Sequence, residues 1–387
     1  MRFFEEKARS ISAFLGTGNR RYLFTLAVAS FVKVVVFSSV AILLSGVPVS
    51  EFPAAVSPIP WLRYFYAWDS GWYAGIATSG WNDWAYVFFP LYPTLMKYVG
   101  IIVGGDVVLA GFLISIILGA AWIPFFENIA EDYMNRRQAL LSTLATACFP
   151  YILVFTSVVY SESLFFFSTI LAWFLYKKNR LLLSGVMAGM ATLTKPYGIL
   201  ILIPMIADAL AKKNWRRLPA IAMVPCLSLL GWMGYLYATT GDAFAFLTAR
   251  QYWVGAGNSQ NTFWWMVSPI FANNPMEYFT QTGSYHISYG GDWLNVPYMA
   301  ITIFVLFGIM VLKVWDFDWR LALFSTSLMT IFLVEGFVGS LVRYFAFVFP
   351  IWFTIRVQRS WTLALLIVFF AAFTVALWYQ FLMGWIG

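Results

Sequence analysis

The chain has 387 residues, of which 61% are hydrophobic and only 11% are charged. Soluble globular domains carry about 25% charged residues, so this composition excludes an ordinary soluble domain. The 20% aromatic content also excludes a disordered chain. The composition instead predicts an all-α polytopic membrane protein. One histidine (His286) and two cysteines in apolar runs (Cys148 and Cys226) argue against a zinc cluster, a disulfide framework and a Ser-His-Asp triad.

Apolar segments recur along the whole chain. A span through the hydrocarbon core of a bilayer needs roughly 20 mainly apolar residues. We expect about eleven transmembrane helices, although several of the segments are short. They lie at about 22–45, 107–126, 138–157, 163–177, 181–196, 198–211, 218–238, 294–312, 320–338, 341–356 and 361–383.

A twelfth apolar stretch, 87–104, is ambiguous because it contains Pro90, Pro93 and Lys97. The positive-inside rule decides its path. If the N-terminus is cytoplasmic and 87–104 does not cross, most of the later basic residues, from Arg136 to Arg359, also face the cytoplasm. If it crossed, those residues would face outward. We therefore predict a re-entrant or interfacial segment. The net charge of +7 is then mainly a topology signal, which excludes nucleic acid as a partner.

This topology leaves two long segments on the outer face, at about 46–106 and 239–293. Both are rich in Trp and Tyr and contain carboxylates, whereas the inner loops are short and mainly basic. We divide the chain into a membrane module (1–238), an outer segment (239–293) and a C-terminal membrane module (294–387). The working surface is expected to face outward.

Asp69 is the most informative acidic residue because it is a lone carboxylate among aromatic residues just outside the first span. Desolvation there would raise its pKa towards that of a useful general base, unless a nearby cation offsets the effect. Alternatively, Asp69 caps the helix that begins at Ser70. The pattern leaves both roles open, and they can coexist.

Five motifs in order carry a family resemblance. They are Trp68-Asp-Ser-Gly-Trp72-Tyr73 followed by Phe88-Phe-Pro-Leu-Tyr-Pro93, then Tyr160-Ser-Glu162-Ser-Leu-Phe165, Ala191-Thr-Leu-Thr-Lys195-Pro-Tyr-Gly198, Thr240-Gly-Asp242-Ala-Phe-Ala-Phe246, and Ser340-Leu-Val-Arg343-Tyr344. Together they resemble the PIG-V (GPI mannosyltransferase 2-like) family of GT-C glycosyltransferases over residues 60–355. Two positions depart from its pattern, since Lys195 replaces an Arg and Ala243 replaces a Pro.

The resemblance implies an inverting mannosyltransferase of the GT-C fold. Its donor would be a polyprenyl (dolichyl-type) phosphate sugar, and its acceptor a hydroxyl of a glycolipid or glycan. Asp69 lies where the family has its catalytic acid, and 87–104 fits its second interfacial helix. The residues expected to contact substrate are Trp68, Trp72, Tyr73, Glu162, Lys195, Asp242, Arg343 and Tyr344.

Several of these residues also have purely structural interpretations. Glu162 favours a helix start that Ser161 could cap, and Lys195 could extend its charge to the membrane surface. Arg343 could be an interfacial anchor, although a guanidinium also matches a phosphate well. Asp242 could cap a helix instead of binding sugar hydroxyls.

Lys33 lies near the middle of the first span, where a charge is costly unless paired or hydrated. An acid on another helix or a lipid phosphate could be its partner, and the sequence does not choose between them. A lipid-linked-sugar flippase or a secondary transporter is the rival function for such charges. No cofactor is expected, and we predict no required metal. The Asp-x-Asp pair of Asp316 and Asp318 faces the cytoplasm, away from lipid-linked donor chemistry.

Overall fold

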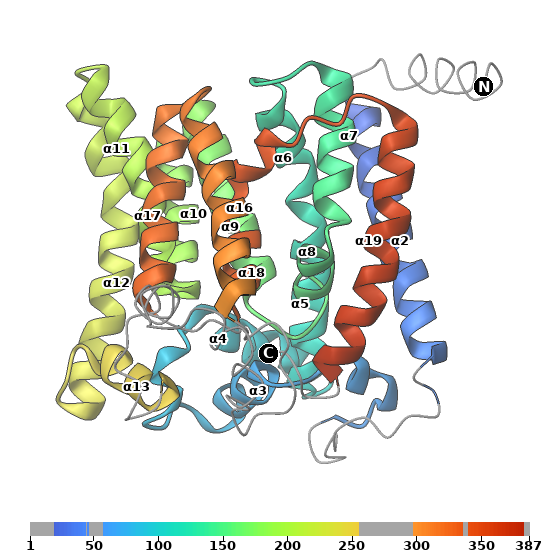
Figure 1. Ribbon diagram of the computed structural model, residues 1–387. Coiled ribbons are helices and arrows are strands. Elements are labelled where there is room, and N and C mark those ends of the chain that lie inside the picture. Colours follow the sequence, from blue (N-terminus) through green and yellow to red (C-terminus); the bar gives the residue numbers. More distant parts are fainter. Residues whose placement is uncertain (1–18, 44, 46–56, 255–296, 336–339, 383–387) are drawn as a thin grey trace, which may run out of the picture.

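The computed structural model describes residues 19–43, 45, 57–254, 297–335 and 340–382, and within these ranges the regular structure is helical. Figure 1 shows the longer helices running side by side as a bundle. The first half contains α2 (Asn19–Leu43), η1 (Pro60–Phe65), α3 (Asp69–Ser79), η2 (Ala85–Val87), α4 (Leu91–Ile102), α5 (Val107–Ala121), α6 (Ile123–Ala130), α7 (Arg136–Ala147), α8 (Pro150–Phe155) and α9 (Glu162–Lys177). The second half contains α10 (Leu181–Thr194), η3 (Pro196–Ile201), α11 (Leu202–Ala211), η4 (Trp215–Arg217), α12 (Leu218–Thr240), α13 (Ala245–Val254), α16 (Pro297–Trp315), α17 (Trp319–Glu335), α18 (Leu341–Ala346), η8 (Phe349–Thr354) and α19 (Ser360–Leu382).

Each predicted span coincides with helix, but the count of eleven is not confirmed. Four helical segments of the described chain are both long and apolar enough to cross a membrane, namely 22–43, 107–130, 215–240 and 360–382. Proline explains why two of the others are shorter. Pro150 begins α8 and Pro350 lies in the first turn of η8, so the predicted spans 138–157 and 341–356 are each divided in two.

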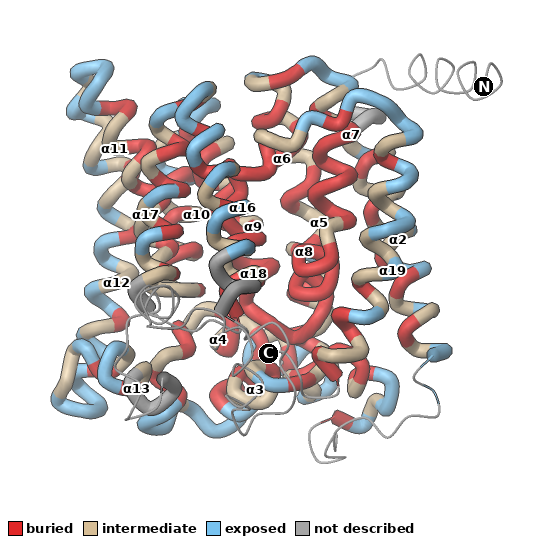
Figure 2. Tube along the Cα trace, in the orientation of Figure 1, coloured by how far each residue is buried: buried red, intermediate tan, exposed pale blue. Residues whose placement is uncertain are grey.

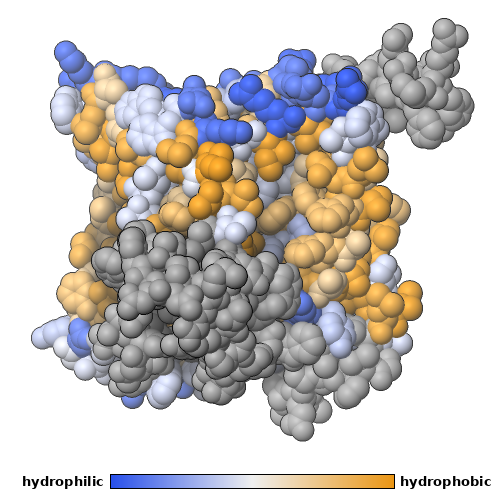
Figure 3. All heavy atoms as spheres, in the orientation of Figure 1, coloured by the Kyte–Doolittle hydropathy of each residue, from blue (hydrophilic) through white to orange (hydrophobic). Residues whose placement is uncertain are grey.

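The two ends of the bundle differ in charge. Basic residues gather at one end of the bundle, where α2 starts and where the basic termini of α7, α9, α11 and α16 lie (Figure 1). The opposite end of the bundle holds α3, α4 and α13. Figure 3 shows a hydrophilic band along the first end and an apolar belt beneath it. We call the end with the hydrophilic band the basic end, and the opposite end, which holds α3, α4 and α13, the loop end. This separation is what the positive-inside pattern predicts for two membrane faces.

The segment 87–104 does not run the length of the bundle. Its main helix, α4, has 12 residues, which is about 18 Å at 1.5 Å per residue and well short of the roughly 30 Å hydrocarbon core. It packs against α3 and α5 at the loop end and exposes Ile101 and Ile102. The prediction that this segment does not cross agrees with its length and place.

One hydrophobic cluster runs from α2 to α19, so C-terminal helices share a core with N-terminal ones. The central helices are buried on most sides, whereas α2, α12 and α19 alternate buried and exposed positions (Figure 2). Exposed apolar residues on these outer helices include Phe31, Leu230 and Phe369. A helix with this pattern presents an apolar face to lipid, and the division into modules at residues 238 and 294 stays a prediction.

Lys33 shows how a cation is accommodated inside the bundle. Its Nζ donates hydrogen bonds to the carbonyl of Gly119 (3.1 Å) and to the carbonyl and hydroxyl of Thr156 (3.2 and 2.8 Å). These bonds connect α2 with α5 and the end of α8. The partners are therefore carbonyls and a hydroxyl, and not the acid that the sequence left open. The close approach needs Gly119, because a Cβ there would overlap the Thr156 carbonyl.

We expect Gly119→Ala to lower the free energy of unfolding by about 1–3 kcal/mol, because the added methyl separates α5 from α8 and displaces Lys33. Gly231→Ala in α12 is the matched control, since a Cβ there meets nothing within 4 Å. That change should be neutral or slightly stabilising. Thermal unfolding of both variants in detergent checks the pair. A Gly119→Ala protein as stable as Gly231→Ala would contradict the packing described.

Candidate functional site

Four of the predicted site residues meet at the loop end of the bundle, each from a different element. Asp69 opens α3, Glu162 opens α9, Lys195 follows α10, and Arg343 lies in α18. Arg343 Nη1 lies 3.0 Å from Asp69 Oδ2, and its Nε lies 3.6 Å from Glu162 Oε1. Lys195 Nζ lies 3.2 Å from the same Glu162 oxygen. We call these four residues the outer charge cluster.

The backbone before Asp69 is locally strained. Trp68 has a φ of 51°, a region that costs a non-glycine residue on the order of 1–3 kcal/mol. The amides of Ser70 and Gly71 then donate to the carbonyls of Ala67 and Trp68, which starts α3. Asp69 is thus a first-turn residue whose carboxylate contacts Arg343, and the alternative that it caps α3 is wrong.

Arg343 is the centre of the cluster. Its side chain is 6% exposed, and its guanidinium carbon lies 5.2–5.3 Å from the ring centres of Phe155, Tyr160 and Tyr344. Aromatic faces attract a cation, so these rings add to the two carboxylates in holding the charge. Arg343 is therefore buried within the protein and is not a simple interfacial anchor.

Glu162 is the most deeply buried carboxylate of the cluster, at 2% exposed. Its Oε1 contacts both cations, whereas its Oε2 is buried without a hydrogen-bond partner among the described residues. A narrow space beside it is also lined by Phe165, Tyr197 and Phe347. The predicted Ser161 cap is wrong, because the Ser161 hydroxyl instead lies 2.7 Å from Tyr73 Oη.

Two tyrosines support the cluster from α3 and from the turn before α9. Tyr160 Oη accepts a hydrogen bond from the Asp69 amide (3.2 Å), and Tyr73 contacts Ser161. Burial raises the pKa of both phenols well above the ordinary value, and the nearby carboxylates Asp69 and Glu162 add to the rise. Both therefore stay neutral near pH 7 and serve as hydrogen-bonding groups rather than bases.

The other predicted residues lie outside this set of charge contacts or only border it. Tyr344 borders it through the ring that faces Arg343. Trp68 donates from its Nε1 to the Phe381 carbonyl (3.1 Å), and Trp72 stacks on Phe88. Asp242 accepts from the Phe244 amide (2.8 Å) and from Thr248 near the start of α13, which favours the capping interpretation.

Some predicted features lie outside the described residues, including most of the outer segment 239–293 with His286. The structure also adds Phe155, Tyr160 and Ser161, which the sequence did not single out as site residues. The quoted motif contained Tyr160 and Ser161, and the aromatic ring of Phe155 carries no local signal of function. The expectation that no metal is required stays a prediction.

The arrangement pairs two carboxylates with two cations, so the cluster is neutral as a whole. Asp69 is the more exposed of the two carboxylates, at 22% against 2% for Glu162, and it opens α3 at the loop end. Arg343 Nε has no hydrogen-bond partner among the described residues, so the guanidinium retains donor capacity. A partly exposed carboxylate beside a guanidinium with an unfilled N–H group can accept a proton while a neighbouring anion is bound.

Two comparisons relate this chain to known proteins. Residues 90–238, less than half of the chain, match the family model described as "Dolichyl-phosphate-mannose-protein mannosyltransferase". Among solved structures, the apo oligosaccharyltransferase of Archaeoglobus fulgidus matches with a TM-score of 0.52 and 14% identity, covering 95% of this chain. The same enzyme tethered with an acceptor peptide containing the NVT sequon matches with a TM-score of 0.52 and 14% identity, again covering 95% of this chain.

This chain spans 56% and 55% of the length of those two oligosaccharyltransferase chains. No sequence among the curated proteins compared matches it significantly. At such low identity the structural likeness establishes the fold, and the finer resemblance to the PIG-V family stays a prediction. The chain is an integral membrane protein with the fold of the GT-C glycosyltransferases.

Proposed function

We propose that this chain is an inverting mannosyltransferase that uses a polyprenyl phosphate donor of the dolichyl type. Its acceptor is a hydroxyl of a glycolipid or a glycan. The outer charge cluster is the observation that carries the proposal, because it combines a partly exposed carboxylate with buried cations at one end of a GT-C fold. The matched family description, which names a dolichyl-phosphate-mannose enzyme, supports the donor class.

Asp69 is the proposed general base. It takes the proton of the acceptor hydroxyl as that oxygen attacks the anomeric carbon from the face opposite the phosphate. One base is enough for inversion, because no glycosyl–enzyme intermediate is formed. A β-linked mannosyl phosphate would therefore give an α-mannoside, a polyprenyl phosphate and a protonated Asp69.

Arg343 and Lys195 are proposed to stabilise the leaving phosphate. The anomeric C–O bond breaks with its electron pair going to the phosphate oxygen, where negative charge develops. Cations fixed in a poorly solvated site stabilise such charge without reorganising. Glu162 contacts both cations through one oxygen and thereby positions them.

The proposed site faces the cell exterior in a prokaryote or the lumen of the endoplasmic reticulum in a eukaryote. This assignment rests on the positive-inside rule, since the cluster lies at the end opposite the basic loops.

Replacing Asp69 with Asn tests the base. The amide keeps the size of the side chain but cannot accept the proton, so we expect turnover to fall about 10²–10⁴-fold. Transfer from polyprenyl-phospho-mannose, assayed in liposomes, measures the effect. Asp106→Asn is the control, because Asp106 caps α5 by accepting from the Val108 and Leu109 amides and an Asn can keep that role. Near-normal turnover in a folded Asp69→Asn protein would remove Asp69 from the mechanism.

Replacing Arg343 with Lys tests recognition of the leaving phosphate. The charge is kept but the planar fork of donors is lost, so kcat/KM for the donor should fall about 100-fold. Arg63→Lys is the matched control, since Arg63 is also near the loop end but contacts Tyr64. Melting temperatures of both variants show whether the fold is kept. If the two variants have equal kcat/KM, the assigned role of Arg343 is wrong.

A further inference from the structure

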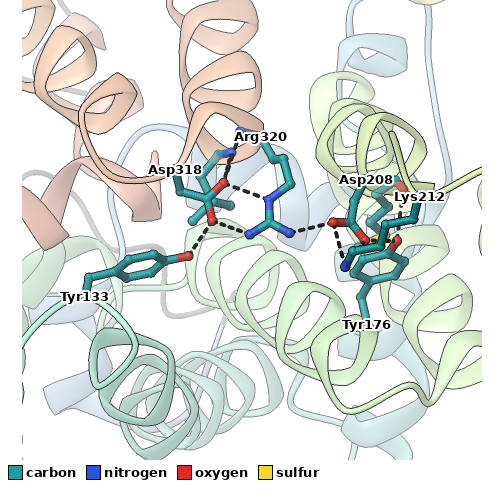
Figure 4. Close-up of polar contacts among 8 residues, drawn as sticks. Tyr133, Tyr176, Asp208, Lys212, Asp318 and Arg320 are labelled. Carbon is teal, nitrogen blue, oxygen red and sulfur yellow. Dashed lines mark hydrogen bonds and ion pairs between the residues drawn. The ribbon is translucent and has the colours of Figure 1, made fainter. Parts of the chain in front are cut away.

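A second charge cluster lies where α11 ends and α17 begins, at the basic end of the bundle (Figure 1). Figure 4 shows its polar contacts. Arg320, in the first turn of α17, is its centre. Its Nη1 lies 2.5 Å from Asp208 Oδ1 in α11, and its Nε and Nη2 lie 2.9 and 2.8 Å from the two oxygens of Asp318. The guanidinium thereby joins α11 to the turn between α16 and α17.

The acceptor capacity of both carboxylates is filled. Besides Arg320 at Oδ1, Asp208 Oδ2 accepts from Tyr176 (2.8 Å) and Lys212 (3.0 Å), and the same ammonium also lies 3.0 Å from Oδ1, so each oxygen has two partners. Asp318 accepts from Tyr133 (2.7 Å) and from the Arg320 amide (3.0 Å) in addition to the guanidinium. A carboxylate has about four lone-pair positions, so neither aspartate has an oxygen to spare for a cation.

The ionisation of Asp318 agrees with this count. Burial by itself would raise the pKa of Asp318, but hydrogen bonds from Arg320 and Tyr133 outweigh it and the pKa is lowered. The carboxylate therefore stays charged and occupied by its protein partners near pH 7.

The donor capacity, by contrast, is not filled. A guanidinium has five N–H groups and an ammonium has three. Arg320 uses three side-chain N–H groups on the aspartates, and the contacts of Lys212 go to Asp208 alone. The Lys212 side chain is 58% exposed. Spare donors without spare acceptors are suited to an anion and not to a metal ion.

These donors line a cavity of about 290 Å³. Its wall combines Lys212, Arg320 and the two aspartates with the aromatic rings of Phe317 and Trp319. Trp319 is 44% exposed, as expected of an aromatic ring near a membrane surface. The cavity lies where α11 ends and α17 begins, and both of these ends are at the basic end, which the positive-inside rule assigns to a membrane surface.

We propose that this cavity binds a phosphate group through the spare N–H groups of Lys212 and Arg320. The group is the headgroup phosphate of an anionic phospholipid or a soluble phosphate. The aspartates fix the geometry of the cations, and the two aromatic rings flank the bound group. This site is independent of glycosyl transfer at the opposite end of the bundle.

Binding of phosphatidylglycerol to the full-length protein tests the proposal. The purified chain in detergent is titrated with the lipid, and retained lipid is counted by native mass spectrometry. Lys212→Gln should weaken the apparent affinity roughly fivefold, because one surface lysine contributes about that much to binding an anionic lipid. Lys213→Gln removes the same charge from the next residue, which does not line the cavity, and should change affinity less than twofold.

Inorganic phosphate distinguishes the two sources. If it competes with phosphatidylglycerol at millimolar concentration, the site takes a free phosphate; if only the lipid binds, the site takes the headgroup. Lys212→Arg should restore affinity in either case and show that the loss is not a folding defect. Equal losses in Lys212→Gln and Lys213→Gln, or no binding of either anion, would overturn the proposal.

Discussion

The burial of Arg343 is the constraint on which the loop end of this molecule depends. A buried cation costs several kcal/mol unless a carboxylate and further partners compensate it. Arg343 obtains Asp69 from α3, Glu162 from α9 and three aromatic rings. Because Asp69 opens α3, this pairing acts together with the Asp69 amide–Tyr160 and Tyr73–Ser161 contacts to hold α3 against the bundle. The contact that stabilises the fold therefore also positions the proposed base beside the proposed phosphate-binding cation.

Three cations along the bundle axis meet the need for compensating partners in three different ways. At the loop end the cluster leaves one oxygen of Glu162 and the Nε of Arg343 without hydrogen bonds among the described residues, so it can still bind a polar substrate. In the interior, Lys33 donates to two carbonyls and a hydroxyl and so connects α2 with α5 and the end of α8. At the basic end, the aspartates beside Arg320 are saturated and only donors are left. In our proposals, the balance of donors and acceptors distinguishes the site for a sugar phosphate from the site for a simple anion.

Much of the fold could be predicted because hydropathy and charge are local properties of the chain. The apolar runs marked the helices, and the distribution of basic residues indicated that 87–104 does not cross. Pro150 and Pro350 are visible in the sequence, but hydropathy alone did not show that helices end beside them within two of the predicted spans. These breaks divide two of the predicted spans, and several others are helices of fewer than 18 residues in the described chain, so the count of eleven is not confirmed.

The site was predictable only in part. Motifs pointed to Asp69, Glu162, Lys195 and Arg343, and the structure brings these four together. Their pairing, the Ser161–Tyr73 contact and the carbonyl partners of Lys33 join residues that are 33 to 274 positions apart, and no local pattern encodes such contacts. A structure of the protein with bound polyprenyl-phospho-mannose tests the central claim most directly. We predict that the donor phosphate contacts Arg343 and that the face of the anomeric carbon opposite the phosphate is turned towards Asp69. A donor phosphate bound away from Arg343, with Asp69 remote from the sugar, would contradict the account.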